Sequence, residues 1–153
     1  MRVSFDLDDT LFVSPDTFQV EEALKFPWNK IYKERLRYGT VRLLNELRKE
    51  GVEVWIYTTS FRSERYIRGL FRKYGIKLDQ IVNGARHRDE VQRDKQEPMP
   101  SKYPSWYRID LHIDDDISVL NNGRVYGFKV FLIGEQDDQW TDKILERIDL
   151  RKP

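Results

Sequence analysis

Residues 2–10, Arg-Val-Ser-Phe-Asp-Leu-Asp-Asp-Thr, form an apolar stretch that stops in acidic residues. The pattern predicts a strand from Arg2 to Asp6, with Asp6 and Asp8 placed where the strand ends and a loop begins. Because unpaired carboxylates are too costly to leave inside a core, these charges should leave the sheet at the carboxyl end of the strand. That edge is where open α/β sheets bind ligands, so a cation is the natural partner. A surface turn rich in Asp is the alternative, and the stretch alone does not exclude it.

Composition limits the kinds of protein that this chain can be. A length of 153 residues is enough for one domain with a real core and too short for two ordinary ones. The net charge of +1, from 27 Lys plus Arg against 26 Asp plus Glu, indicates no global attraction to nucleic acid or membranes, so any basic partner surface must be local. Nucleic acid stays open as a substrate, and so does oligomer formation.

The absence of cysteine excludes disulfides, thiolate metal sites and cysteine nucleophiles. No stretch is apolar for long enough to cross a bilayer, and the start Met-Arg-Val-Ser-Phe lacks the apolar core of a secretion signal. We therefore expect a soluble cytoplasmic protein without membrane partners, whose chemistry uses oxygen and nitrogen ligands.

Apolar stretches alternate with helical patterns along the chain, which predicts a parallel sheet with helices on both faces. The expected strands are Arg2 to Asp6, Val52 to Thr58, Asp79 to Val82, Ile109 to Ile113 and Lys129 to Ile133. Apolar residues at helical spacing predict crossover helices that end at Gly51 and Gly75, and a closing helix that starts near Trp140. The expected fold is a three-layer, Rossmann-like α/β domain around a mostly parallel five-stranded sheet.

Two stretches exceed what a minimal sheet needs. Residues 11–39 carry two prolines and many aromatic residues, and are expected to form a small insertion beside the acidic stretch. Residues 86–106 are highly charged and contain three prolines, which favours a long loop, ordered or partly mobile. The whole chain, residues 1–153, is expected to be a single domain with these two insertions.

Three further groups of polar residues are expected at the same edge of the sheet. The second strand ends in Thr58 and Thr59, whose hydroxyls can hold a phosphoryl oxygen. The fourth strand ends in Asp114 and Asp115, and Lys102 lies in the loop before it. Two carboxylate groups that face each other repel strongly unless a divalent ion neutralises them. Ligation by oxygen alone suits Mg²⁺.

In this order, the Asp-x-Asp stretch, the strand-end Thr, the Lys and the Asp pair resemble the four motifs of the haloacid dehalogenase superfamily of phosphohydrolases. The resemblance extends from Val3 to about Ile133, and the first and fourth motifs are the specific ones. It implies that Asp6 is the nucleophile, which forms an aspartyl-phosphate, and that Asp8 is the general acid and base. An Asp at the latter position favours a phosphatase, and halide chemistry is not expected.

The same resemblance assigns the binding roles. Thr58 would bind the phosphoryl group, Lys102 would neutralise charge, and Asp115 with Asp114 would complete a magnesium site that includes Asp6. In this family the backbone carbonyl at the position of Asp8 is a further magnesium ligand. The expected substrate is a phosphate monoester. Since both insertions are short, the enzyme should be minimally capped, with an open site.

Several alternatives remain open from the sequence. Lys95 is a rival to Lys102, and either Asp114 or Asp115 can be the direct metal ligand. A non-catalytic module that binds metal or phosphate and acts through a protein or nucleic-acid partner is the alternative function. A response-regulator receiver domain is rejected, because its phosphoacceptor Asp ends the third strand, where this chain has Asn83.

Three other polar residues receive structural interpretations. His112 alternates with apolar neighbours in a strand and is interpreted as packed rather than as a ligand. Arg62 and Arg65 follow the strand-end threonines closely enough for one of them to reach a substrate, but a solvated helix face is the preferred interpretation of each.

Overall fold

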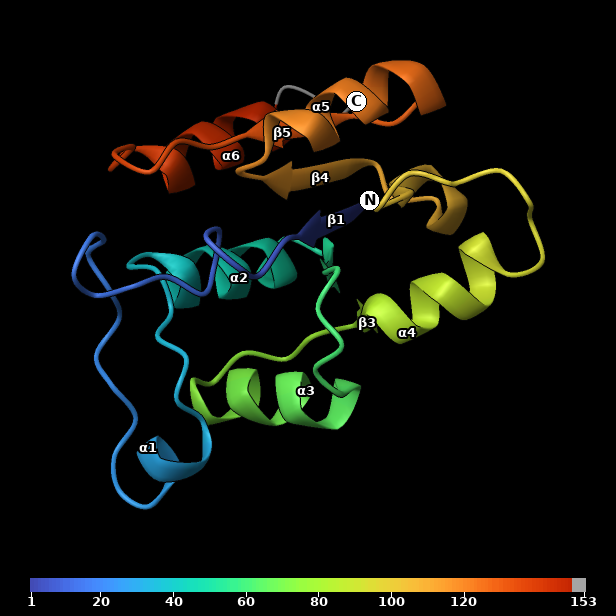
Figure 1. Cartoon of the computed structure of the whole chain (residues 1–153). Helices are drawn as coiled ribbons and strands as arrows, with labels where there is room; N and C mark the ends of the chain where they lie inside the picture. Colours follow the sequence, from blue (N-terminus) through green and yellow to red (C-terminus); the bar gives the residue numbers. More distant parts are fainter. Residues whose placement is uncertain (150–153) are drawn as a thin grey trace.

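Five parallel strands form the centre of the molecule, in the order β3-β2-β1-β4-β5 (Figure 1). The computed structural model describes residues 1–149, so the last four residues of the expected domain lie outside the described part. The strands are β1 Arg2–Phe5, β2 Glu53–Tyr57, β3 Gln80–Val82, β4 Leu111–Asp114 and β5 Val130–Leu132. The predicted α/β class and all five strands are confirmed, with strand ends that differ by no more than two residues from those expected.

Three amphipathic helices cover one face of the sheet. These are α2 (Thr40–Lys49), α3 (Glu64–Lys73) and α6 (Trp140–Asp149), and their buried residues join those of the strands in the main core. Strand β2 shows why two faces exist, because Val54 and Ile56 point into this core while Trp55 and Tyr57 point away from it.

The opposite face is covered by shorter elements. They are α4 (Gly84–His87), a π-helical turn (Arg88–Gln92), a 3-10 turn (Pro104–Tyr107) and α5 (Ile117–Tyr126). Trp55 and Tyr57 of β2 pack here against Tyr107. None of the helices in residues 1–149 is long and apolar enough to cross a membrane.

The sequence patterns did not predict helix α5. Its apolar residues do not gather on one side of the helix, and Asn121, Asn122 and Gly123 are weak helix formers. Tertiary contact explains the helix, since Val119 packs with Val130 of β5, and Gly123 lies directly against the backbone of Phe128, two residues before that strand. The stretch expected as a loop from residue 86 likewise begins with helical turns through Gln92.

Residues 11–39 form an irregular excursion that returns to the sheet edge. Its one short helix is α1 (Trp28–Ile31), and isolated bridges pair Phe12 with Leu36 and Val20 with Arg37. The excursion packs on α3, where the rings of Tyr32 and Tyr66 are 5.3 Å apart. It therefore borders the edge of the sheet at which β1 and β2 end (Figure 1).

We predict that Gly123→Ala destabilises the protein, although alanine is the better helix former by about 1 kcal/mol. A Cβ at Gly123 would lie 2.5 Å from the backbone oxygen of Phe128, so α5 would have to move away from the turn that leads into β5. Urea unfolding should show a lower midpoint for this variant. The control is Asn121→Ala on the exposed side of the same helix, which should be neutral or stabilising; a stabilised Gly123→Ala would contradict the packing argument.

Candidate active site

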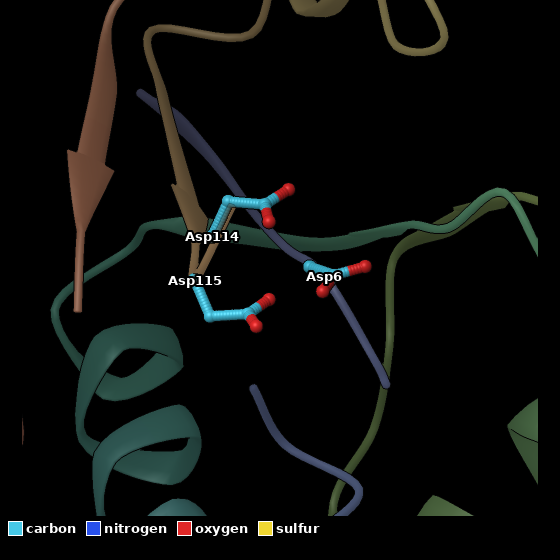
Figure 2. A group of neighbouring side chains, drawn as sticks. All are labelled: Asp6, Asp114 and Asp115. Carbon is cyan, nitrogen blue, oxygen red and sulfur yellow. The ribbon is translucent and has the colours of Figure 1, made fainter. Parts of the chain in front are cut away.

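The carboxylates of Asp6, Asp114 and Asp115 gather at the carboxyl ends of β1 and β4 (Figure 2). The two strands are neighbours, and Phe5 pairs in register with Ile113. The residues that follow this pair therefore leave the sheet side by side, and the Asp6 N–H donates to the Ile113 carbonyl at 2.9 Å. Parallel pairing is thus what joins two acidic stretches that are far apart in the sequence.

Lys102 lies between two of these carboxylates. Its Nζ is 2.7 Å from Oδ1 of Asp6 and 2.5 Å from Oδ2 of Asp114, and the side chain is only 4% exposed. Burial alone would lower the pKa of Lys102, but the charges of Asp6 and Asp114 outweigh burial and raise the pKa. The ammonium is therefore a fixed positive charge in the site.

The rival lysine lies elsewhere. The Lys95 ammonium donates to the Val91 carbonyl at 2.9 Å and lies 4.1 Å from the ring centre of Trp106. The structure thus brings Lys102, and not Lys95, to the carboxylates.

His112, buried in β4, forms hydrogen bonds to one of the site carboxylates and to Ser4. Its Nε2 is 2.8 Å from Oδ2 of Asp114, and its Nδ1 is 2.7 Å from the Ser4 hydroxyl. Burial lowers the pKa of His112, so the ring is neutral. A neutral ring that donates from Nε2 to the carboxylate accepts at Nδ1, which makes Ser4 the donor there. His112 is packed, as the sequence indicates, but its polar role was not foreseen.

The pKa values of the two buried carboxyls are shifted in opposite directions. Burial raises the pKa of Asp6 to about 7, with Lys102 acting against this rise and the charge of Asp114 adding to it. Burial would also raise the pKa of Asp114, but the hydrogen bond from His112 and the charge of Lys102 hold it well below its usual range. Burial raises the pKa of the third carboxyl, Asp115, as well.

Thr10 is a site residue that the sequence did not single out. Its hydroxyl is fully buried, 3.0 Å from Oδ2 of Asp6 and 3.1 Å from Oδ1 of Asp115. The tight turn after β1, in which the Leu7 carbonyl accepts from three successive N–H groups, turns Thr10 back toward Asp6. The spacing of four residues between Asp6 and Thr10 was the available signal.

The carboxylate of Asp8 does not belong to this group of three and pairs with Arg62. The two guanidinium nitrogens of Arg62 are 3.0 and 3.1 Å from the two oxygens of Asp8. Nε of Arg62 also donates to Glu34 of the excursion at 3.1 Å. The hydrogen bond with Asp8 raises the pKa of Arg62. The interpretation of Arg62 as part of a solvated helix face is therefore wrong, whereas Arg65 is exposed on α3 as expected.

The threonines after β2 occupy different positions. Thr58 is almost fully buried, and its hydroxyl accepts from the Ser60 N–H at 3.1 Å, which leaves the hydroxyl proton available for donation. Thr59 is exposed and lines the hollow above the carboxylates. Asp116, beside the acidic pair, has a structural role, because it caps α5 by accepting from the Ser118 N–H at 2.8 Å.

An open hollow of about 470 Å³ lies above these groups. It is lined by Asp6, Asp8, Asp9, Thr59, Ser101, Lys102, Asp114, Asp115, Asp116, Ile117 and Val119. One ligand atom from each of Asp6, Asp114 and Asp115 lies within 4.8 Å of the others. Ligands on opposite sides of a Mg²⁺ ion are about 4 Å apart, so small adjustments would allow all three to hold one divalent cation.

The fold is shared with solved hydrolases. A haloacid dehalogenase (HAD) superfamily hydrolase, subfamily IA, from Geobacter sulfurreducens PCA matches with a TM-score of 0.53 and 14% identity, over 86% of this chain and 88% of that one. The chain has the HAD fold. A D,D-heptose 1,7-bisphosphate phosphatase from B. bronchiseptica, complexed with magnesium and phosphate, shares the HAD fold at a TM-score of 0.51 and 12% identity, over 95% and 98% of the two chains.

A chain of the Pnkp1/Rnl/Hen1 RNA repair complex also matches, with a TM-score of 0.53 and 18% identity. The match covers 86% of this chain but only 42% of that one, so this HAD-fold chain corresponds to less than half of that relative. At such identities the likenesses establish the fold. No protein-family model and no curated protein matches the sequence.

We predict that Lys102→Met lowers the free energy of unfolding by about 3–5 kcal/mol at pH 8, as expected when one partner of a buried ion pair is removed. Asp6 and Asp114 would then face each other without a cation. Because the folded-state pKa of Asp6 lies near 7, above its unfolded value, the deficit should be greatest above pH 7 and shrink as the pH falls and Asp6 takes a proton.

Urea unfolding of this variant at pH 5 and pH 8 measures the effect. Lys95→Met is the matched control, since Lys95 is exposed, and its stability should stay within about 0.5 kcal/mol of the wild type. Equal losses in both variants, or a loss independent of pH, would contradict the role of Lys102 as a buried counter-charge.

Proposed function

We propose that this protein is a Mg²⁺-dependent phosphatase that hydrolyses phosphate monoesters through an aspartyl-phosphate on Asp6. The observation that carries the proposal is the placement of the Asp6 carboxylate. Oδ1 accepts from Lys102 and Oδ2 accepts from Thr10, at the floor of an open hollow with Asp114 and Asp115 beside it. A nucleophilic carboxylate needs such cationic surroundings, because the phosphate that it attacks is itself anionic.

Asp6, Asp114 and Asp115 would hold the ion, with the backbone carbonyl of Asp8 as a further ligand. Hard oxygen donors of this kind suit magnesium. When bound, the ion supplies positive charge that offsets the repulsion between carboxylate and phosphate. The solved phosphatase complexed with magnesium and phosphate supports this choice by its shared fold.

The reaction then takes place in two displacements. An oxygen of Asp6 forms a bond to phosphorus while the bond to the ester oxygen breaks, and Asp8 gives its proton to the leaving alcohol. A water molecule next attacks phosphorus, Asp8 takes a proton from that water, and inorganic phosphate leaves as Asp6 is restored. Lys102 stays charged throughout and orients Asp6, while Thr58 and Thr59 donate hydroxyl protons to the phosphoryl oxygens.

Arg62 limits when Asp8 can act as an acid. Its bidentate contact occupies both carboxylate oxygens of Asp8, whereas the first displacement needs one of them beside the leaving oxygen. Arg62 therefore has to release Asp8 before the first step. Glu34 already holds Nε of Arg62, so the two terminal nitrogens are the ones that turn from Asp8 to the anionic substrate.

The shape of the hollow bears on the size of the substrate, and the composition of the chain bears on its location. The hollow is open, which favours a substrate that extends beyond the phosphoryl group. A cytoplasmic location stays a prediction, based on the absence of cysteine.

We predict that Asp6→Asn abolishes hydrolysis of p-nitrophenyl phosphate, with kcat at least about a thousandfold lower, because an amide is not a nucleophile of comparable strength. The assay is run with saturating Mg²⁺ and repeated with excess chelator, which should also remove the activity. Asp16→Asn, an exposed residue of the excursion, is the control and should keep wild-type rates. Wild-type protein that binds Mg²⁺ but hydrolyses none of a panel of phosphate esters would favour the non-catalytic module instead.

A second expectation concerns Mg²⁺ binding and pH. With the pKa of Asp6 raised to about 7 in the metal-free protein, this carboxyl is partly protonated at neutral pH and must lose its proton to bind the ion. The apparent Mg²⁺ affinity should rise about tenfold from pH 6 to pH 8. Calorimetric titration at pH 7 in two buffers of different ionisation enthalpy should detect the released proton, and Asp6→Asn should release less. Binding of Mg²⁺ without proton release by the wild type would refute this account.

A further inference from the structure

Positive charge is concentrated in two short segments of a chain that is nearly neutral overall. Residues 25–34 and 62–77 together carry nine Lys or Arg against two acidic residues, whereas the whole chain has 27 against 26. The cations are Lys25, Lys30, Lys33, Arg62, Arg65, Arg68, Arg72, Lys73 and Lys77. The rest of the chain is therefore net acidic, and any electrostatic attraction for a polyanion is local to these segments.

The fold places these two segments side by side, as the positions of α1 and α3 indicate (Figure 1). The ammonium of Lys73 lies 3.6 Å from the ring centre of Trp28. The Tyr32 hydroxyl packs so closely on Gly69 that a Cβ there would lie 2.3 Å from it. Trp28 and Tyr32 of the excursion thus share one surface with the cations of α3.

This surface is hollowed between the two segments. A groove of about 260 Å³, here called the α3 basic groove, is lined by Tyr32, Arg65, Arg68, Gly69, Arg72 and Lys73. Arg68 is held by Glu64 and by the Leu78 carbonyl. Within residues 1–149, no acidic side chain forms an ion pair with Arg65 or Arg72. Two exposed guanidinium groups are therefore available to anionic oxygens.

Exposed aromatic residues lie on α1 and just before it. Phe26 is 77% exposed and Trp28 is 39% exposed, although rings of this size are usually buried. Unpaired bases stack on aromatic rings while their phosphates follow a basic groove, which is how sequence-tolerant proteins hold single strands. A duplex keeps its bases stacked inside and would not use these rings.

The near end of the basic surface is at the active site. Arg62 contacts Asp8 on one side and Glu34 of the excursion on the other, and α3 begins two residues after it. A strand lying along α3 would thus have one end beside the carboxylates.

We propose that the α3 basic groove binds single-stranded nucleic acid and directs a phosphorylated strand end toward Asp6. The proposal deepens the proposed function by naming the substrate class, and its binding component does not require turnover. A groove fits a strand better than it fits a flat bilayer, so nucleic acid is the proposed ligand. Preferential binding to a membrane surface is a result of the test that would contradict the proposal. The low net charge of the chain is compatible with this, because only the local surface carries the cations.

The test is fluorescence anisotropy of a labelled single-stranded oligonucleotide of about 20 nucleotides, titrated with the inactive Asp6→Asn protein. We expect saturable binding at low salt that weakens as salt rises, with log K falling linearly against log salt. The charge-reversal pair Arg65→Glu with Arg72→Glu should lower the affinity at least tenfold and flatten the salt dependence. Phe26→Ala with Trp28→Ala should lower affinity at high salt too, since stacking is not screened.

The matched control is Arg124→Glu with Lys129→Glu, two exposed cations outside both basic segments, whose reversal changes net charge equally. It should keep affinity within about twofold of the parent. Thermal melts verify that all variants are folded. Equal losses in the control and groove pairs, no binding at low salt, equal affinity for duplex, or stronger binding to vesicles of anionic lipid would each overturn the proposal.

Binding and catalysis can fail separately. Wild-type protein that hydrolyses p-nitrophenyl phosphate but binds no strand would leave the proposed function intact and refute the groove. Asp6→Asn protein that binds strands through the groove, beside a wild type that releases phosphate neither from p-nitrophenyl phosphate nor from a terminally phosphorylated oligonucleotide, would support the groove and refute the phosphatase.

Discussion

The buried contact of Lys102 with Asp6 and Asp114 is the constraint on which the site depends. Parallel pairing of β1 with β4 brings the two carboxylates together at the end of the sheet, and two buried negative charges at that separation would repel strongly. One ammonium relieves this repulsion and fixes both side chains. Burial, which Lys102 only partly offsets, raises the pKa of Asp6 to about 7, so this carboxyl changes its charge near neutral pH.

Much of this arrangement could be predicted because it follows from strand ends. A strand that stops in Asp-Leu-Asp and another that stops in Asp-Asp deliver their side chains to one edge whenever the sheet is parallel. Residues 117–126 show where such reasoning fails: helix α5 is stabilised by the packing of Val119 on β5 and of Gly123 on Phe128, and no apolar stripe marks it in the sequence. The helical turns from residue 84 to 92 likewise lack an apolar stripe, since Gly84 and Val91 are their only buried residues.

Contacts between distant polar residues were also beyond the sequence. His112 alternates with apolar neighbours like any packed residue, and only the register that pairs it with Ser4 shows that the polar side chains form a buried chain to Asp114. Arg62 carries no local sign that its guanidinium turns back to Asp8. The net charge did not reveal the α3 basic groove either, because a value of +1 is the sum of a local positive surface and a net acidic remainder.

The guanidinium of Arg62 has one further consequence, because it links the excursion to Asp8. Glu34 and Asp8 share a single guanidinium, and Glu34 also accepts from the Tyr66 hydroxyl at 2.6 Å. An exchange of residues 11–39 for the corresponding segment of another HAD-fold protein would remove Glu34, one of the two carboxylates that hold Arg62, and would so change what positions the guanidinium beside Asp8. The excursion and the partner of Asp8 are therefore coupled, and a transplanted excursion would need a matching residue at position 62.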